Sequence, residues 1–345
     1  MIDKVAFLNF KCLHDVRVDL ERFTVFVGPN ASGKSSILEG MHRLCVVFSN
    51  SPGDAGSKAA TAVSRGSKEP VELSAEISGR WYRFRPSPSE GPAIPILTQH
   101  VVVLEDGEPK AAEPRAKVWE EWNFKRNGPS PLPLSVLLRL ETSNLIRSKP
   151  TSDPTILMSD GKNLHSALAS MALNDPDSWQ RLQTDVRRII PTIRRLRHTR
   201  KTNDPSLLFD TVGGDSLSAE EVSEGTLLVV GMLAALHASE RPSLILLDDL
   251  DRGLHPRAQK ELVALLRGML DTHSDLQIVA TTHSPYMLDC VDTREVRMTF
   301  LTDEGATVCE PLTSHPQYQK WKDEMTPGEM WSLFGERWLV EESAT

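Results

Sequence analysis

The run from Gly28 to Ser35 constrains this chain more than any other feature. It reads Gly-Pro-Asn-Ala-Ser-Gly-Lys-Ser and follows an apolar stretch at 23–27. It matches the pattern GxxxxGK[ST], in which a glycine-rich turn joins a strand to a helix and its backbone N–H groups face a phosphate. The helix expected at about 34–48 points its positive end at the same place. The sequence therefore predicts a nucleotide-binding loop within an α/β fold.

The residues of this loop have separate predicted tasks. Lys34 is expected to reach the β- and γ-phosphates of a nucleotide. Ser35 offers a hydroxyl ligand to Mg²⁺, a cation that prefers oxygen ligands. The predicted cofactors are therefore ATP and Mg²⁺. The remaining predicted nucleotide contacts of the loop are Asn30, Ala31, Ser32, Gly33 and Ser36.

A second motif supplies the acids that such a loop needs. An apolar stretch at 244–247 ends in Asp248 and Asp249, which is the pattern of a Walker B strand. Asp248 is predicted to hold Mg²⁺ through water, and Asp249 to polarise the attacking water. His283 stands 34 residues after Asp249, behind another apolar stretch at 277–281. It is therefore a candidate for a position beside the γ-phosphate.

The start of a further helix is predicted just upstream of that strand. Ser223 is suited to cap the helical pattern at 226–238, and Gly225 permits a close approach of the backbone. The N–H groups at such a helix start form a second anion site.

The spacing of apolar residues predicts the rest of the fold. Short alternating runs before residue 28 predict strands of a β-meander. A helix between the strands at 244–247 and 277–281 favours parallel pairing of these two strands. The remaining predicted elements are, in chain order, strands at 71–77, 81–84 and 96–104, two helices within 163–190, strands at 192–200 and 206–211, and a helix at 257–270.

Composition excludes several classes of protein. The chain has 345 residues, of which 39% are hydrophobic and 25% charged, as in globular proteins. We expect a cytoplasmic protein, because no stretch approaches the roughly 18 apolar residues of a membrane helix and the N-terminus lacks a signal-peptide pattern. The four cysteines form no CxxC pair, which favours buried thiols over a zinc site or disulfides.

The charge distribution leaves two interpretations open. The net charge of −8 repels nucleic acid, so binding to nucleic acid would need a local basic patch. The segment Arg187–Lys201 carries seven Lys and Arg residues. It is either a solvated surface or a contact for nucleic acid or a partner.

In combination, these motifs resemble the ATPase heads of the ABC class, in particular the SMC/RecF-like and OLD-like branch of AAA_21-like proteins. The resemblance includes an opening Asn-Phe-Lys-x-Leu at 9–13, Ser-Glu-Gly-Thr at 223–226, Gly-Leu-His-Pro at 253–256 and Thr-Thr-His-Ser-Pro at 281–285. No heptad pattern persists, so we expect no coiled-coil arms. Only 62 residues follow His283, too few for the Toprim nuclease domain that OLD-like proteins often carry.

The resemblance implies a single two-lobed head over residues 1–345. Its fold would be α/β, with a mixed central sheet, a phosphate-loop helix, an antiparallel N-terminal β-meander and a helical subdomain. Residues 1–110 would form the β-rich part with Walker A, 111–215 the helical lid, and 216–345 the signature, Walker B and switch part with the C-terminal tail.

The resemblance also implies a composite site made by two chains. ATP bound to one head would be covered by the helix start at Ser223 and Gly225 of another head, and hydrolysis would release the pair. His283 would act as the switch toward the γ-phosphate, and His255 would lie in the turn that faces the partner. Lys11 would approach the nucleotide from the N-terminal strands. Gln99 is a candidate for the glutamine loop of the family.

The function implied is a Mg-ATP-binding and hydrolysing ATPase that dimerises or oligomerises around ATP. It would regulate an effector in trans, a nuclease or toxin, in bacterial antiphage defence. The family usually has glutamate where this chain has Asp249, which is one methylene shorter. Because a displacement of about 1 Å can cost on the order of a hundredfold in rate, we expect slow turnover.

Three points stay open at this stage. One rival is a RecF-like repair ATPase that binds DNA through 187–201, and another is a non-hydrolysing, ATP-locked scaffold. The tail with Trp331 and Trp338 is either a docking surface for a partner or a segment packed on its own head.

Overall fold

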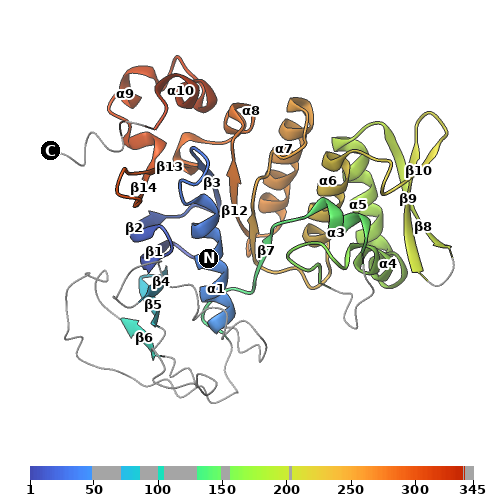
Figure 1. Ribbon diagram of the computed structural model, residues 1–345, viewed down its shortest axis with the longest axis horizontal. Coiled ribbons are helices and arrows are strands. Elements are labelled where there is room, and N and C mark those ends of the chain that lie inside the picture. The colour runs from blue at the N-terminus through green and yellow to red at the C-terminus, as the bar shows by residue number, and fades with distance from the viewer. Residues whose placement is uncertain are drawn as a thin grey trace. The chain divides into compact units, whose positions relative to one another are not determined.

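The computed structural model describes residues 1–48, 71–85, 100–104, 130–148, 156–201, 204–336 and 338. Figure 1 labels the helices and strands, coloured by their order along the chain. By its internal contacts the chain forms two compact units. The first unit comprises Met1–Ser135, Ser243–Leu246 and Asp275–Thr345, and the second comprises Val136–Pro242 and Leu247–Ser274.

An antiparallel sheet occupies the N-terminal part of the first unit. Each pair of neighbouring strands in it is antiparallel, as predicted. The last strand of the meander predicted before residue 28, β3 (Phe23–Val27), is not part of this sheet, because it pairs in parallel within the central sheet. The buried Val5 and Phe7 and the buried Val16 and Val18 show the two-residue alternation of strands with one covered face. The sheet has the order β2 (Leu13–Asp19), β1 (Lys4–Phe10), β4 (Glu72–Ile77), β5 (Arg80–Arg85) and β6 (His100–Leu104).

The central sheet has six strands of mixed direction. Strand β3 pairs in parallel with both β12 and β13, whereas β13 and β14 are antiparallel. Every residue of β3 and β12 is buried, as in strands covered on both faces. The order is β14 (Thr307–Pro311), β13 (Val296–Leu301), β3 (Phe23–Val27), β12 (Gln277–Thr282), β11 (Leu244–Leu247) and β7 (Ser135–Leu138).

Helix α1 (Lys34–Phe48) follows β3 after the glycine-rich run, as predicted. Its apolar residues recur at helical spacing, and Ile37, Leu38, Met41 and Leu44 are fully buried. The strand, turn and helix that a phosphate loop requires are therefore present in this order.

The C-terminal tail packs on the first unit. Helix α10 (Pro327–Phe334) lies against α8 (Pro285–Leu288), and Gly328 N–H donates to Asp289 Oδ1 at 2.9 Å. Trp338 is buried, with its ring centroid 5.0 Å from that of His315. Of the two interpretations of the tail, these contacts favour packing on its own head. The short helices nearby are η1 (Thr293–Glu295), η2 (Leu312–Ser314) and α9 (Tyr318–Trp321).

The second unit is mainly helical, as expected for a helical subdomain. It also contains a small antiparallel sheet in the order β10 (Ser216–Ser218), β9 (Asp204–Thr211) and β8 (Ile193–Lys201). Its helices are α3 (Thr142–Ile146), α4 (Leu164–Asn174), α5 (Pro176–Ile189), α6 (Glu224–Leu236) and α7 (Pro256–Thr272).

Helix α6 lies in the core of this unit. Every residue from Gly225 to Leu236 is buried, as expected for a helix that is apolar on all sides. It begins at Glu224, two residues earlier than the apolar spacing predicted, because the Ser223 side chain caps it by accepting from Thr226 N–H at 3.3 Å. No helix within the described ranges is long and apolar enough to cross a membrane.

Candidate functional site

The phosphate loop leaves β3 at Val27 and enters α1 at Lys34. The Lys34 ammonium donates to the carbonyl oxygens of Gly28 at 2.9 Å and Pro29 at 2.7 Å. These bonds hold the 5% exposed lysine against the backbone of the loop. Ser32 and Gly33 are also buried, whereas Asn30, Ala31 and Ser35 are exposed and Ser36 is half-buried.

His283 lies at the same edge of the sheet as this loop. Strands β12 and β3 are parallel, and their register pairs Thr282 with Val27. His283 and Gly28 therefore directly follow the ends of two neighbouring strands. The first unit thus brings the predicted switch histidine and the start of the phosphate loop together.

Lys11 contacts the phosphate-loop helix rather than the loop itself. Its ammonium donates to Glu39 of α1, and Arg43 donates to the other oxygen of the same carboxylate at 2.6 Å. Lys11 has a positive φ of 57°, which turns the chain between β1 and β2. The expectation that Lys11 approaches the nucleotide stays a prediction.

In the second unit, Asp248 and Asp249 follow β11 and differ in their surroundings. Asp248 Oδ2 accepts from Arg139 Nε at 2.8 Å, and the Asp248 side chain is 9% exposed. Asp249 is exposed and has a φ of 55°, in the left-handed region that asparagine and aspartate tolerate better than most residues. The first carboxylate thus contacts a cation, and the second belongs to an exposed residue on a tight turn.

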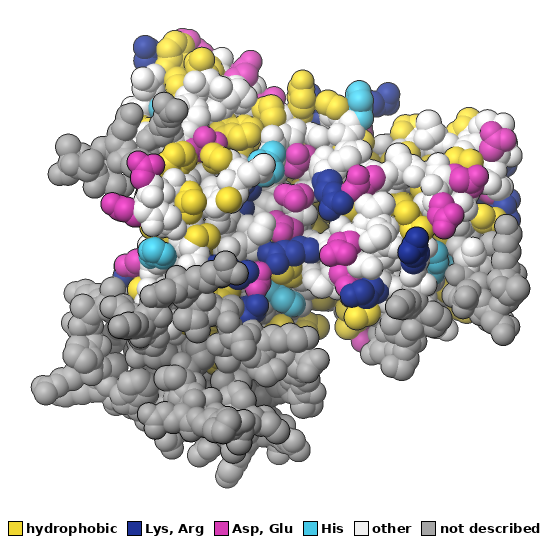
Figure 2. Space-filling model, viewed as in Figure 1, with side chains coloured by type: hydrophobic (Ala, Val, Ile, Leu, Met, Phe, Trp, Pro, Cys, Tyr) yellow, Lys and Arg dark blue, Asp and Glu magenta, His cyan; other side chains and the backbone are white. Residues whose placement is uncertain are grey.

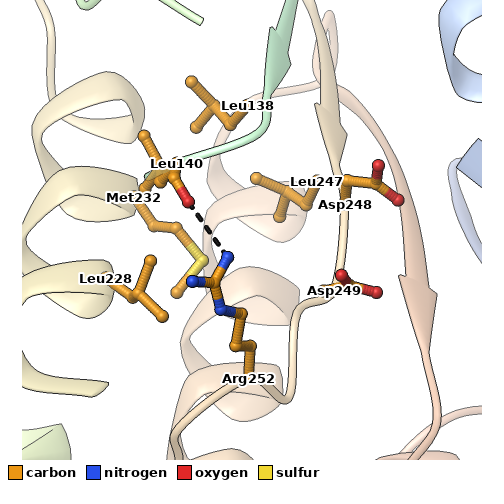
Figure 3. A pocket seen from close by; sticks show the side chains of 8 residues that line it. All are labelled: Leu138, Leu140, Leu228, Met232, Leu247, Asp248, Asp249 and Arg252. Atoms are coloured by element: carbon orange, nitrogen blue, oxygen red, sulfur yellow. Dashed lines mark hydrogen bonds between the residues drawn. The ribbon is translucent and has the colours of Figure 1, made fainter. Parts of the chain in front are cut away.

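A small pocket adjoins these aspartates within the second unit. Figure 3 shows Leu138, Leu140, Leu228 and Met232 on one side and the two carboxylates on the other. Arg252 reaches between them and donates to the Leu140 carbonyl at 3.3 Å (Figure 3). The backbone of Leu140, on the apolar side of the pocket, therefore accepts a hydrogen bond from Arg252 and helps to hold its side chain.

The signature segment contacts the turn after Asp249. A Cβ at Gly225 would lie 2.1 Å from the Gly253 carbonyl oxygen, so only glycine fits here. Glu224 accepts from Thr142 Oγ1 at 2.9 Å and from Arg252, and these hydrogen bonds, the one from Thr142 first, lower the pKa of Glu224. Within the second unit, the predicted signature segment thus contacts the turn that follows the predicted Walker B strand.

His255 is exposed at the start of α7, in the turn that follows this contact. Its Nδ1 accepts from Arg257 N–H at 3.3 Å, so it caps the helix. A role toward a partner chain stays a prediction.

The predicted oxygen donors fit the preferences of Mg²⁺. Ser35, an exposed residue at the start of α1, has a hydroxyl oxygen, and Asp248 has a carboxylate. Mg²⁺ usually takes one or two protein oxygens and completes its shell with phosphate oxygens and water.

Three arginines of the basic segment 187–201 are paired with acids. Arg195 and Arg197 donate to Asp210 at 2.6 and 2.7 Å, and Arg188 donates to Glu261 at 2.9 Å. Hydrogen bonds from Arg197, Ser216 and Arg195 hold the pKa of Asp210 well below its usual range. In Figure 2, basic side chains on the described part of the visible face lie interspersed with acidic ones. The side chains of Arg200 and Lys201, and Gln99 as a whole, lie outside the described residues.

Comparison with known proteins identifies the family. Residues 106–289, more than half of the chain, match the AAA_21 family, described as "AAA domain, putative AbiEii toxin, Type IV TA system". The chain belongs to the AAA_21 family. Residues 1–75 also match AAA_15, described as an AAA ATPase domain. The resemblance to an ATP-binding ATPase head is thereby confirmed.

Solved structures confirm the fold of this AAA_21 chain. The head of an SMC protein bound to the C-terminal winged-helix domain of ScpA has 14% sequence identity and a TM-score of 0.60, with 92% of this chain and 99% of that chain covered. An SMC head with an extended coiled coil, bound to the C-terminal domain of ScpA from Pyrococcus furiosus, has 13% identity and a TM-score of 0.57, covering 94% and 99%. The fold is that of an ABC-type ATPase head.

Sequence reasoning missed three residues at these sites: Arg139 on Asp248, Arg252 on Glu224, and Thr299 beside the phosphate loop. No short motif contains them. Each acts on a residue at least 28 positions away in sequence, so only the folded chain brings the partners together.

Proposed function

We propose that this AAA_21 protein binds Mg-ATP at the phosphate loop and hydrolyses it slowly, as a cytoplasmic ATPase. The observation that carries the proposal is the geometry of the loop: Lys34 is buried at the start of α1 and bonded to the Gly28 and Pro29 carbonyls. The start of a helix carries a partial positive charge that favours a phosphate, and the lysine adds a cation at the same place.

In this proposal Lys34 contacts the β- and γ-phosphates, with Asn30 to Gly33 and Ser36 around them. Ser35 and Asp248 would hold Mg²⁺ through oxygen, and the ion would supply positive charge that stabilises the transferring phosphate. His283 faces the γ-phosphate from the end of β12. The parallel register of β12 and β3 supports this position for the histidine.

Asp249 is the proposed base that orients and polarises the attacking water. Its exposure and its left-handed backbone support a role that needs access to a ligand. Aspartate is shorter than the usual glutamate, so we expect a low rate of hydrolysis and a long-lived ATP-bound state.

We also propose that ATP joins two copies of the chain, with Ser223 and Gly225 of one copy covering the nucleotide of the other. The exposed Ser223 and the capped start of α6 suit this task. The assembly would act on a nuclease or toxin effector in bacterial antiphage defence. The family description, with its toxin and its type IV system, and the SMC heads bound to ScpA support a partner-regulating role.

Steady-state ATP hydrolysis tests the proposal. Asp249→Asn should lower the rate at least about a hundredfold while ATP still binds, because a general base contributes 10²- to 10⁴-fold. Asparagine tolerates the left-handed backbone, so this variant changes the carboxylate alone. Asp215→Asn, in an exposed turn of the second unit, is the matched control and should hydrolyse ATP like the wild type.

Two results would overturn parts of the proposal. Full activity of Asp249→Asn removes Asp249 from the mechanism. ATP that survives purification of the wild type, with no phosphate release in the assay, instead supports an ATP-locked scaffold.

Direct DNA binding through 187–201 is the weaker alternative, because Asp210 and Glu261 already pair with three of its arginines. The alternative predicts salt-dependent binding of duplex DNA, lost on charge reversal at Arg194, Arg195 and Arg197. Absence of such binding at low salt excludes it.

A further inference from the structure

The hairpin of β13 and β14 runs directly behind the phosphate loop. A Cβ at Gly28 would lie 2.1 Å from the Thr299 carbonyl oxygen, and a Cβ at Gly33 would lie 2.3 Å from Thr307 Oγ1. Both glycines of the motif thus touch a threonine of this hairpin. The loop has these glycines because the hairpin leaves no room for a side chain.

The two threonines differ in what their hydroxyl groups do. Thr299 Oγ1 donates to the Val27 carbonyl at 3.2 Å and lies 2.6 Å from Ser32 Oγ. Thr307 Oγ1 is buried and has no hydrogen-bond partner within the described ranges. Both side chains are almost fully buried, so the hairpin places one bonded and one unbonded hydroxyl against the glycines of the loop.

The bond directions connect Thr299 to the lysine of the loop. Because the Thr299 hydrogen is used on the Val27 carbonyl, the Ser32 hydroxyl donates to Thr299. The Ser32 oxygen then keeps its lone pairs free to accept from Lys34 Nζ, at 3.5 Å. A chain of hydrogen bonds therefore runs from Lys34 through Ser32 and Thr299 to the end of β3.

We propose that Thr299 is a positioning residue for nucleotide binding. It holds Ser32 in the orientation that faces Lys34 and keeps the buried side of the loop in one conformation before the nucleotide arrives. A loop ordered in advance binds more tightly, because less conformational freedom is lost on binding. The inference rests on the proposed use of this loop for ATP.

Three variants test it by isothermal titration with ATP and Mg²⁺. Thr299→Val replaces the hydroxyl by a methyl group and should weaken ATP binding about tenfold, the size expected when Ser32 loses an acceptor and the Val27 carbonyl loses a hydroxyl donor. Thr299→Ser keeps the hydroxyl and should bind ATP within about twofold of the wild type. Thr307→Val removes an unbonded hydroxyl and should also stay within about twofold.

A second measurement does not depend on ATP. In the nucleotide-free protein, amide hydrogen exchange across 29–35 should be faster in Thr299→Val than in the wild type or in Thr307→Val. A general loss of packing would instead speed exchange throughout α1 and β3. If Thr299→Val does not fold, Ser32→Ala removes the other hydroxyl of the pair and should show the same local effect.

The proposal falls if Thr299→Val binds ATP like the wild type, or if Thr307→Val loses as much affinity as Thr299→Val. It also falls if loop exchange is unchanged in Thr299→Val. If the wild type itself does not bind ATP, the proposed function fails, and the exchange comparison still decides the role of Thr299.

Discussion

The phosphate loop of the first unit and the Asp248–Asp249 turn of the second are held in place by different forces. Around the loop, neutral hydroxyl and carbonyl groups make the bonds, and the Lys34 ammonium rests on carbonyl oxygens. Around the turn, arginines hold carboxylates: Arg139 binds Asp248, and Arg252 binds Glu224. The loop is thus held by neutral hydrogen bonds and by packing on the β13–β14 hairpin, whereas at the turn ion pairs add to the packing of Gly225 on Gly253.

This difference suggests how each region responds to a ligand. Packed backbone tolerates almost no change of shape, so the loop should bind phosphate in a nearly preformed conformation. Ion pairs can exchange partners when another charged group arrives, so the turn is the better candidate for rearrangement.

The largest effect is expected at Gly33. Alanine there would place Cβ 2.3 Å from Thr307 Oγ1, on a backbone with φ of 99°, and should weaken ATP binding at least about 100-fold. Gly305→Ala is the control, because Gly305 has φ of 81° but a Cβ there would meet no other atom within 4 Å in the described part of the chain. It carries a similar backbone strain without the clash and should bind ATP like the wild type. Equal losses in both variants would mean that strain alone, and not packing on the hairpin, matters.

The same comparison can be made in the second unit. Gly225→Ala would force Cβ to 2.1 Å from the Gly253 carbonyl and should lower the free energy of unfolding by about 2 kcal/mol. Gly268→Ala on α7 places its Cβ more than 4 Å from any neighbouring atom of the described residues and should instead gain about 0.5 kcal/mol from helix propensity. Urea unfolding measures both. A stable Gly225→Ala variant would show that the contact between α6 and the turn adapts easily.

Breaking an ion pair should have a smaller effect than these glycine substitutions, and the quantity affected should be the rate of ATP hydrolysis. Arg139→Gln removes the cation beside Asp248 and should slow ATP hydrolysis about tenfold, as for partners that orient a metal ligand. Arg188→Gln breaks a pair of similar length, 2.9 against 2.8 Å, that is more exposed, and should leave hydrolysis unchanged. If both variants hydrolyse ATP like the wild type, Arg139 has only a surface role.

Much of this architecture could be predicted from the sequence, because its signals are local. The strand, turn and helix of 23–48 lie within one continuous segment, and the apolar stretches that become β11 and β12 are buried at every residue. The antiparallel N-terminal sheet follows from a two-residue alternation. Such patterns involve neighbours along the chain, so no knowledge of the fold is needed to find them.

The supporting contacts could not be predicted, because they join distant segments. Arg139 follows β7 and meets Asp248 109 positions later, and Thr299 meets Ser32 across 267 positions. An arginine or threonine in a sequence does not indicate its partner. The basic segment stayed ambiguous in the sequence because its charges do not show which strand residue faces them: Asp210, 13 and 15 positions away on the next strand, pairs with two of its arginines.

The smallest effect is expected in the titration of Glu224, and it tests pairing without steric change. Thr142→Val removes the hydroxyl donor that contributes most to lowering the pKa of Glu224 below its ordinary 4.5, so this pKa should rise. Because the folded-state pKa is lowered, Glu224 stabilises the fold above the ordinary value and loses that contribution as the pH falls through the folded value. The cost is small, since the Glu224 side chain is 43% exposed. Carboxyl ¹³C shifts measured against pH should move for Glu224 but not for Glu329, whose lowered pKa comes from Thr326 at the start of α10. An unchanged Glu224 titration in Thr142→Val would assign the pairing to Arg252 alone, and the turn would then be held by ion pairs without help from a neutral donor.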